Sequence, residues 1–316
     1  MHRFASAAAA AGALTILLAP AAAGARMPKP AKSQRVAIEF AAVAGTTPVR
    51  CGSPIGGLGT TARSATLTDL RFFVSDVRLL RRDGRAVAVR LAPDSPFRVT
   101  RGKAAVTLID LENGRGGCAE AGTKATNAFV RGSVPQGDYV GARWSVGVPF
   151  ALNHSDATTA PAPLNSAAMA WSWQVGRKFT KIEVSDPGGG TPWAARTFFV
   201  HLGSTGCTGN PATGETANCS ASNRPQIVLR RFDAARQRVA VDLKALLAGV
   251  DVTVNGGGAG GCMAGMSDPE CGPIFRAFGL SAPAGGGMEM GGGMEMGGMS
   301  AAASAAPRQT VFRAIR

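Results

Sequence analysis

Two histidines are the side chains of this sequence best suited to chemistry. Beyond a basic and apolar start that contains His2, the chain has only His154 and His201. His154 ends the run PFALNH, and His201 begins the run HLGSTGC. Neutral imidazole is the commonest metal ligand in proteins. Both histidines close strand-like runs, and the loops of a β-sandwich gather at its two ends. We therefore expect the two rings to converge on one metal ion.

A pair of tryptophans follows His154, in the run MAWSWQ. Residues two apart on a strand point to the same face, so Trp171 and Trp173 should lie side by side. Large aromatic side chains dominate β cores, and one interpretation is that both are core residues. Their closeness to His154 gives equal weight to the other interpretation, in which they line a site and face the histidine pocket.

All six cysteines follow the first 25 residues, and their number is even. This pattern is typical of disulfides in an oxidising compartment. The two shortest loops favour two pairs and leave a third: Cys207–Cys219, Cys262–Cys271 and Cys51–Cys118. The alternative is a thiolate-bound zinc or iron–sulfur site, which the absence of any CxxC disfavours. A blue-copper centre would also need an unpaired thiolate.

The first 25 residues have the features of a secretory signal. A basic start, an apolar centre and small residues at small-x-small positions are present in that order. No later apolar run approaches the roughly 20 residues that span a membrane. We therefore expect a periplasmic or secreted protein without a membrane span. The net charge of +14 comes from scattered arginines, and export argues against a nucleic-acid partner.

The elements that must position these residues are short strands. Apolar alternation and turn signals predict strands near 36–40, 70–80, 87–91, 106–111, 139–148, 169–175, 179–184, 197–200, 227–232 and 239–247, the last running into a helical turn. Frequent glycine and proline argue against long helices. The fold class is therefore mainly β, a single antiparallel β-sandwich with long loops over residues 26–283.

Residues 284–316 have a different composition, rich in Met, Gly and Ala. Such a segment offers little to pack, and we predict a disordered tail. Its five methionines are Met288, Met290, Met294, Met296 and Met299. Thioether sulfur suits Cu(I), so the tail methionines either bind Cu(I) weakly or are compositional drift.

Several motifs occur together in an order that resembles one protein family. The segments are FFVSDVRLL with its DG turn, VTLIDLENG, GVPFALNH, TAPAPLN, MAWSWQVGRKF, HLGSTGC, NRPQIVL, VAVDLKALLAGVDV and the stretch from Cys262 to Phe275. They resemble the MbnP family of secreted copper-binding proteins, also called metallo-mystery-pair four-Cys proteins. The resemblance covers roughly residues 36–280. The sequence departs from the family pattern at Val175-Gly176-Arg177, which follows WSWQ, and at Ala170. These departures affect the surroundings of the ligands and not the ligands themselves.

The resemblance implies a copper site and a modifying partner. In that family a di-haem partner similar to cytochrome c peroxidases (MbnH-like) oxidises a tryptophan to kynurenine, which helps histidines bind copper. Carried over, the ligands are His154 and His201, and Trp171 or Trp173 is the kynurenine precursor. The implied function is copper transport, storage or homeostasis by a binding protein that is not an enzyme. The alternatives are a secreted hydrolase that uses His154 or His201 as general base, and a metal-free scaffold or adhesion domain.

Overall fold

The computed structural model describes residues 32–172, 174–190, 192–265, 268–281 and 307–316. The proposed signal, Trp173 and the five tail methionines therefore lie outside the described residues. Ser33–Arg316 forms one compact unit. No helix in the described part of the chain is long and apolar enough to cross a membrane.

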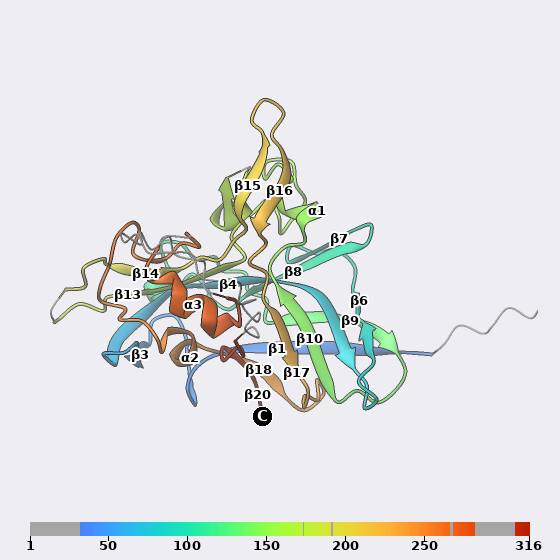
Figure 1. Cartoon of the computed structure of the whole chain (residues 1–316). Coiled ribbons are helices and arrows are strands. Elements are labelled where there is room, and N and C mark those ends of the chain that lie inside the picture. Colours follow the sequence, from blue (N-terminus) through green and yellow to red (C-terminus); the bar gives the residue numbers. More distant parts are fainter. Residues whose placement is uncertain (1–31, 173, 191, 266–267, 282–306) are drawn as a thin grey trace, which may run out of the picture. The chain divides into compact units, whose positions relative to one another are not determined.

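The chain folds into two large sheets and two small ones (Figure 1). The ten-stranded sheet contains β3 (Pro54–Leu58), β4 (Arg63–Leu80), β5 (Ala86–Ala88), β7 (Arg98–Arg101), β8 (Ala104–Asp110), β10 (Gly141–Val146), β13 (Thr180–Ser185), β14 (Thr197–Val200), β17 (Gln226–Leu229) and β19 (Gly261–Cys262). The six-stranded sheet contains β1 (Ser33–Ala44), β2 (Thr47–Pro48), β6 (Arg90–Leu91), β9 (Phe129–Pro135), β18 (Arg238–Asp242) and β20 (Phe312–Ile315).

The remaining elements are short. Two separate hairpins pair β11 (Ala170–Ser172) with β12 (Gly176–Arg177), and β15 (Thr205–Asn210) with β16 (Glu215–Ala221). The helices are α1 (Phe150–Asn153), α2 (Leu243–Leu247), α3 (Cys271–Phe278) and the 3-10 turns η1 (Gly116–Cys118) and η2 (Ala167–Met169). The expected strand running into a helical turn is β18 followed by α2, which Asp242 caps by accepting from the backbone N–H of Lys244 and Ala245.

Aromatic side chains pack the two large sheets face to face. Phe40 of β1 meets Phe72 of β4 and Trp144 of β10 edge-on, at ring-centroid distances of 5.5 and 5.6 Å. Edge-to-face contact is a favoured arrangement of aromatic pairs. The fold is therefore mainly β with a sandwich core, as predicted. Two strand pairs, β1–β18 and β14–β19, are parallel and differ from the antiparallel expectation, since long connections bring each later strand back in the same direction.

The C-terminal segment corrects the expected extent of the tail. Residues 307–316 are described, and β20 pairs with β18. Val311 and Phe312 are buried, and Phe312 contacts the rings of Phe72 and Trp144. The prediction of a disordered tail to Arg316 is thus wrong for this stretch. In its short apolar run, VFRAI, Val311 and Phe312 are buried and the backbone pairs with β18, and both contributions offset the cost of ordering the chain.

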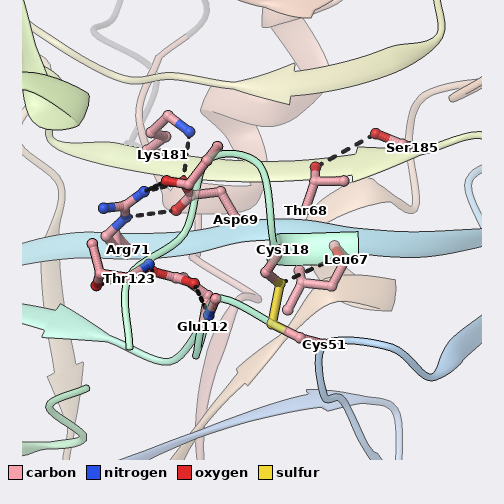
Figure 2. The surroundings of a disulfide bond; sticks show 12 residues. Cys51, Leu67, Thr68, Asp69, Arg71, Glu112, Cys118, Thr123, Lys181 and Ser185 are labelled. Atoms are coloured by element: carbon pink, nitrogen blue, oxygen red, sulfur yellow. Dashed lines mark hydrogen bonds and ion pairs between the residues drawn. A yellow bond between two sulfur atoms is a disulfide. The ribbon is translucent and has the colours of Figure 1, made fainter. Parts of the chain in front are cut away.

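Three disulfides join Cys51–Cys118, Cys207–Cys219 and Cys262–Cys271, and the described chain has no free cysteine. These are the pairs that the loop-length argument favoured. Cys118 lies in the core beside β4, where its Sγ is 3.4 Å from the carbonyl oxygen of Leu67 (Figure 2). Cys262 on β19 continues the sheet beside β14, directly before the position of His201.

Candidate metal centre

His201 lies immediately after β14 and is 3 % exposed. Its backbone N–H donates to the carbonyl of Cys262, which fixes the chain where the strand ends. The imidazole lies beside the rings of Phe199 and Trp171, with centroid distances of 5.2 and 6.3 Å. Trp171, on β11, meets it edge-on. A Cβ at Gly203 would lie 2.9 Å from the Trp171 ring, so the glycine of the HLGSTG run lets the indole pack here.

A buried carboxylate holds one nitrogen of His201. Nε2 lies 2.8 Å from Oε1 of Glu183, and Nδ1 is buried without a hydrogen-bond partner. Burial lowers the pKa of His201, and the hydrogen bond to Glu183 opposes that effect only in part. The ring is therefore neutral near pH 7, and the contact is a hydrogen bond although its length suits an ion pair. An ionised carboxylate can only accept, so Nε2 carries the proton and Nδ1 has the lone pair.

Glu183 belongs to a row of buried charges across the ten-stranded sheet. Lys181 of β13 bridges Glu183, at 2.8 Å, and Asp69 of β4, which also pairs with Arg71. Figure 2 shows the Asp69, Arg71 and Lys181 part of this row. Burial by itself raises the pKa of Glu183, but hydrogen bonds from His201 and Lys181 and the Lys181 charge hold it below its usual range. The row thus keeps Glu183 ionised and supplies a fixed acceptor to His201.

His154 lies in a second cluster, directly after α1. It is half-buried, and its Nε2 is 3.1 Å from Nδ2 of Asn153 and 3.6 Å from Sγ of Cys219. Its ring also packs on Phe150, at a centroid distance of 4.8 Å. Within the described residues, one ring nitrogen of His154 and the sulfurs of Cys207 and Cys219 all lie within 4.8 Å of one another. The structure thus places His154 against the β15–β16 hairpin.

Arg177 holds the chain around His154. It is one of the residues at which the sequence departs from the family pattern. Its buried guanidinium donates to the carbonyls of Leu152, Asn153, Ser155 and Leu164. Its backbone N–H donates to Oδ1 of Asn153. Burial lowers the pKa of Arg177, with Asp156 opposing. Five guanidinium donors in a rigid fork suit several carbonyls at once, so the residue fixes the loop that carries His154.

The segment 170–177 contacts both clusters. Trp171 packs on His201, the Val175 carbonyl accepts from Asn153, and the Gln174 side chain donates to the Cys207 carbonyl. The structure therefore brings Trp171 to His201 and brings His154 to the Cys207–Cys219 disulfide. A metal ion shared by both histidines would have to join these clusters, and their convergence stays a prediction. The orientation of Trp173 also stays a prediction.

The geometry fits a histidine-ligated soft or borderline metal. A buried imidazole nitrogen without a partner is rare, and a carboxylate on the opposite nitrogen is the usual arrangement around ligating histidines. The residues that sequence reasoning missed are Glu183, Asn153 and Arg177. The charged positions in the TKIEVS run were a visible signal, but only the strand register shows that they are buried beside a histidine.

Comparison with known proteins adds two findings. The family model described as MbnP matches residues 33–264 of the chain. Among solved structures, MbnP from Methylosinus trichosporium is similar, with 35% sequence identity and a TM-score of 0.73. That match covers 90% of this chain and 98% of the other chain. A search of curated proteins gave no match.

Proposed function

Because this chain belongs to the MbnP family, we propose that it is a copper-binding protein that serves copper transport or homeostasis. Copper suits imidazole ligands in both of its common oxidation states. The observation that carries the proposal is the buried Nδ1 of His201, which has no hydrogen-bond partner while Glu183 holds Nε2. His201 binds copper through Nδ1, and His154 is the second histidine ligand.

Trp171 is the described candidate for conversion to a third ligand. Its ring meets His201 edge-on, so a change to the indole alters the surroundings of the imidazole. Oxidative cleavage of the indole C2–C3 bond adds two oxygen atoms, and hydrolysis then releases the formyl group as formate. The product, kynurenine, has an arylamine and a ketone where indole offers almost no lone pair. The oxidant is hydrogen peroxide activated at the haem of a di-haem partner protein, and two peroxide molecules each supply one oxygen atom and leave as water.

The location proposed for this activity is the periplasm or the exterior of the cell. Three disulfides in the described chain support an oxidising compartment. The first 25 residues have the sequence features of an export signal, although they lie outside the described residues. In this setting the protein is a metal carrier and the substrate of its partner.

Copper titration of single variants tests the proposal. Wild-type protein, co-expressed with the di-haem partner, should bind one copper ion tightly, and His201→Ala and His154→Ala should each lose that binding. Phe129→Leu, a change remote from both clusters, should not. Peptide mass spectrometry should find kynurenine at Trp171 or Trp173, as a net exchange of one carbon for one oxygen. Tight binding that survives both histidine changes would contradict the proposal.

The arrangement around His201 disfavours the hydrolase alternative. A general base must lie within hydrogen-bond reach of the nucleophile that it activates. In the described part of the chain, Nε2 of His201 bonds to Glu183 and Nδ1 has no partner. Neither ring nitrogen of His201 therefore contacts a serine hydroxyl. An esterase or peptidase assay of the wild-type protein should accordingly show no activity that His201→Ala removes.

A further inference from the structure

The Cys207–Cys219 disulfide lies at an imidazole, unlike the other two disulfides. The Nε2 atom of His154 is 3.6 Å from Sγ of Cys219. The potential ligand atoms of His154, Cys207 and Cys219 lie within 4.8 Å of one another. Two sulfurs and one imidazole nitrogen at this spacing are a ligand set for a soft cation once the sulfurs are thiolates.

The β15–β16 hairpin would keep the two sulfurs together after reduction. Cys207 and Cys219 are directly opposed in the antiparallel register, with Thr205 opposite Ala221 and Asn210 opposite Glu215. The Gln174 side chain also donates to the Cys207 carbonyl, at 2.7 Å. Opposed residues of such a pair keep their Cβ atoms about 5 Å apart without any covalent link. The site is therefore preorganised by backbone pairing.

His154 is held against the hairpin by bonds that do not involve the disulfide. Asn153 donates to the Val175 carbonyl, and its Nδ2 also lies 3.1 Å from Nε2 of His154, where Cu(I) binding would replace that contact. Arg177 fixes the carbonyls on both sides of His154, those of Asn153 and Ser155. Figure 1 shows α1 beside β15 and β16. A cavity of about 770 Å³ between α1 and the hairpin is lined by Phe150, His154 and residues 214–217, and gives a metal ion access to the imidazole.

Burial distinguishes this disulfide from the other two. Cys207 and Cys219 are half-buried on a hairpin whose neighbouring residues are mostly exposed. Each of the other two disulfides has at least one fully buried cysteine, namely Cys118, Cys262 and Cys271, and Cys51 is half-buried. The other cluster with metal-ligand spacing, Cys51–Glu112–Cys118, uses its carboxylate to accept from the backbone N–H of Gly114 and Thr123. Access limits thiol–disulfide exchange, so a dithiol reductant should reduce Cys207–Cys219 first.

We propose that reduction of the Cys207–Cys219 disulfide creates a Cu(I) site formed by Cys207, Cys219 and His154. A dithiol reductant supplies two electrons and two protons, which cleave the S–S bond to two thiols, and the reductant becomes a cyclic disulfide. Cu(I) then binds both sulfurs and the imidazole nitrogen, and the two thiol protons are released. Copper stays Cu(I) throughout. The site therefore responds to the redox state of the compartment.

This redox-dependent site goes beyond the proposed function. It differs from the copper centre proposed above in that Cys207 and Cys219 are its other two ligands beside His154. The copper centre proposed above exists in the disulfide-bonded protein and requires His201. The redox-dependent site requires two thiolates and does not use His201. Both use His154, so reduction moves His154 from one copper environment to the other. The variants below separate the two sites.

The test measures which cysteines Cu(I) protects from alkylation. Full-length protein is reduced with dithiothreitol without oxygen, desalted, and treated with iodoacetamide with or without Cu(I) buffered by bicinchoninate. Peptide mass spectrometry then locates the alkylated cysteines. We expect alkylation of Cys207 and Cys219 alone in the copper-free protein, and loss of that alkylation with Cu(I). X-ray absorption spectroscopy should find more sulfur ligands around copper in the wild-type protein than in the Cys207→Ser/Cys219→Ser variant. Both proteins have the same tail methionines, so the difference reports Cys207 and Cys219.

Two variants make the outcomes decisive. His201→Ala should leave Cu(I) protection of Cys207 and Cys219 intact, even if it removes copper from the oxidised protein. His154→Ala should require more Cu(I) for the same protection. The proposal is overturned if the disulfide resists reduction whenever the protein is folded, or if reduced cysteines are alkylated equally with and without Cu(I). Equal protection in wild-type and His154→Ala proteins would overturn the assignment of the imidazole.

Discussion

Replacement of Glu183 by glutamine should change which nitrogen of His201 carries the proton. In the wild-type protein Glu183 can only accept, so Nε2 of His201 donates and Nδ1 keeps its lone pair. The glutamine amide can also donate to Nε2, which would place the proton on Nδ1. Rings with the proton on Nδ1 would then lack the lone pair that we assign to copper.

The size of the effect follows from the contacts of Glu183. Loss of a carboxylate partner behind a ligating histidine costs about 10–100-fold in metal affinity. The free energy of unfolding should fall by less than the roughly 3–5 kcal/mol that a fully broken buried ion pair costs, because Lys181 keeps its contact with Asp69. Ser185→Ala is the matched control, because Ser185 is on the same strand and contacts Thr197 instead.

Two measurements check this prediction independently. Nitrogen-15 NMR of histidine-labelled, copper-free protein reports the protonated nitrogen of His201, and competition titration reports copper affinity. We expect a shift toward Nδ1 protonation and weaker copper binding in Glu183→Gln, with neither in Ser185→Ala. An unchanged tautomer with unchanged affinity would refute the argument that Glu183 positions the lone pair.

The other predictions concern stability and the tail. Phe312→Ala should lower the free energy of unfolding by about 3–5 kcal/mol in denaturant titration, because Phe312 is buried among aromatic rings; a loss under about 1 kcal/mol would mean that β20 is dispensable. Burial, reinforced by Glu112, raises the pKa of Asp110 to about 7, so this group makes the wild-type protein less stable as pH rises from about 4 through 7. Asp110→Asn should remove this contribution to the pH dependence of the free energy of unfolding. In urea unfolding, the stability of the variant relative to wild type should therefore be greater at pH 8 than at pH 5. Serine replacement of the five tail methionines, with residues 307–316 kept, should remove only weak Cu(I) equivalents and leave the unfolding midpoint unchanged; loss of the tight site would make the tail a ligand arm.

Local patterns in the sequence predicted the longer central strands, because each of these carries its own alternation of apolar residues. They missed β3, β7, β9 and β20. The run from Arg238 to Leu247 is a strand that passes into a helix, as the pattern indicated. The disulfide pairs also followed from local reasoning about short loops. The β15–β16 hairpin was not predicted, since its residues are polar, exposed and rich in glycine and threonine and show no apolar face.

Sequence by itself determined the family motifs, the secondary-structure class and the two histidines as candidate ligands. Only the tertiary structure decided that Glu183 holds His201, that Arg177 holds the chain at His154, and that β20 completes a sheet. The physical reason is that apolar periodicity is a property of neighbouring residues. A buried hydrogen bond depends instead on the register between strands distant in sequence, which no single segment encodes.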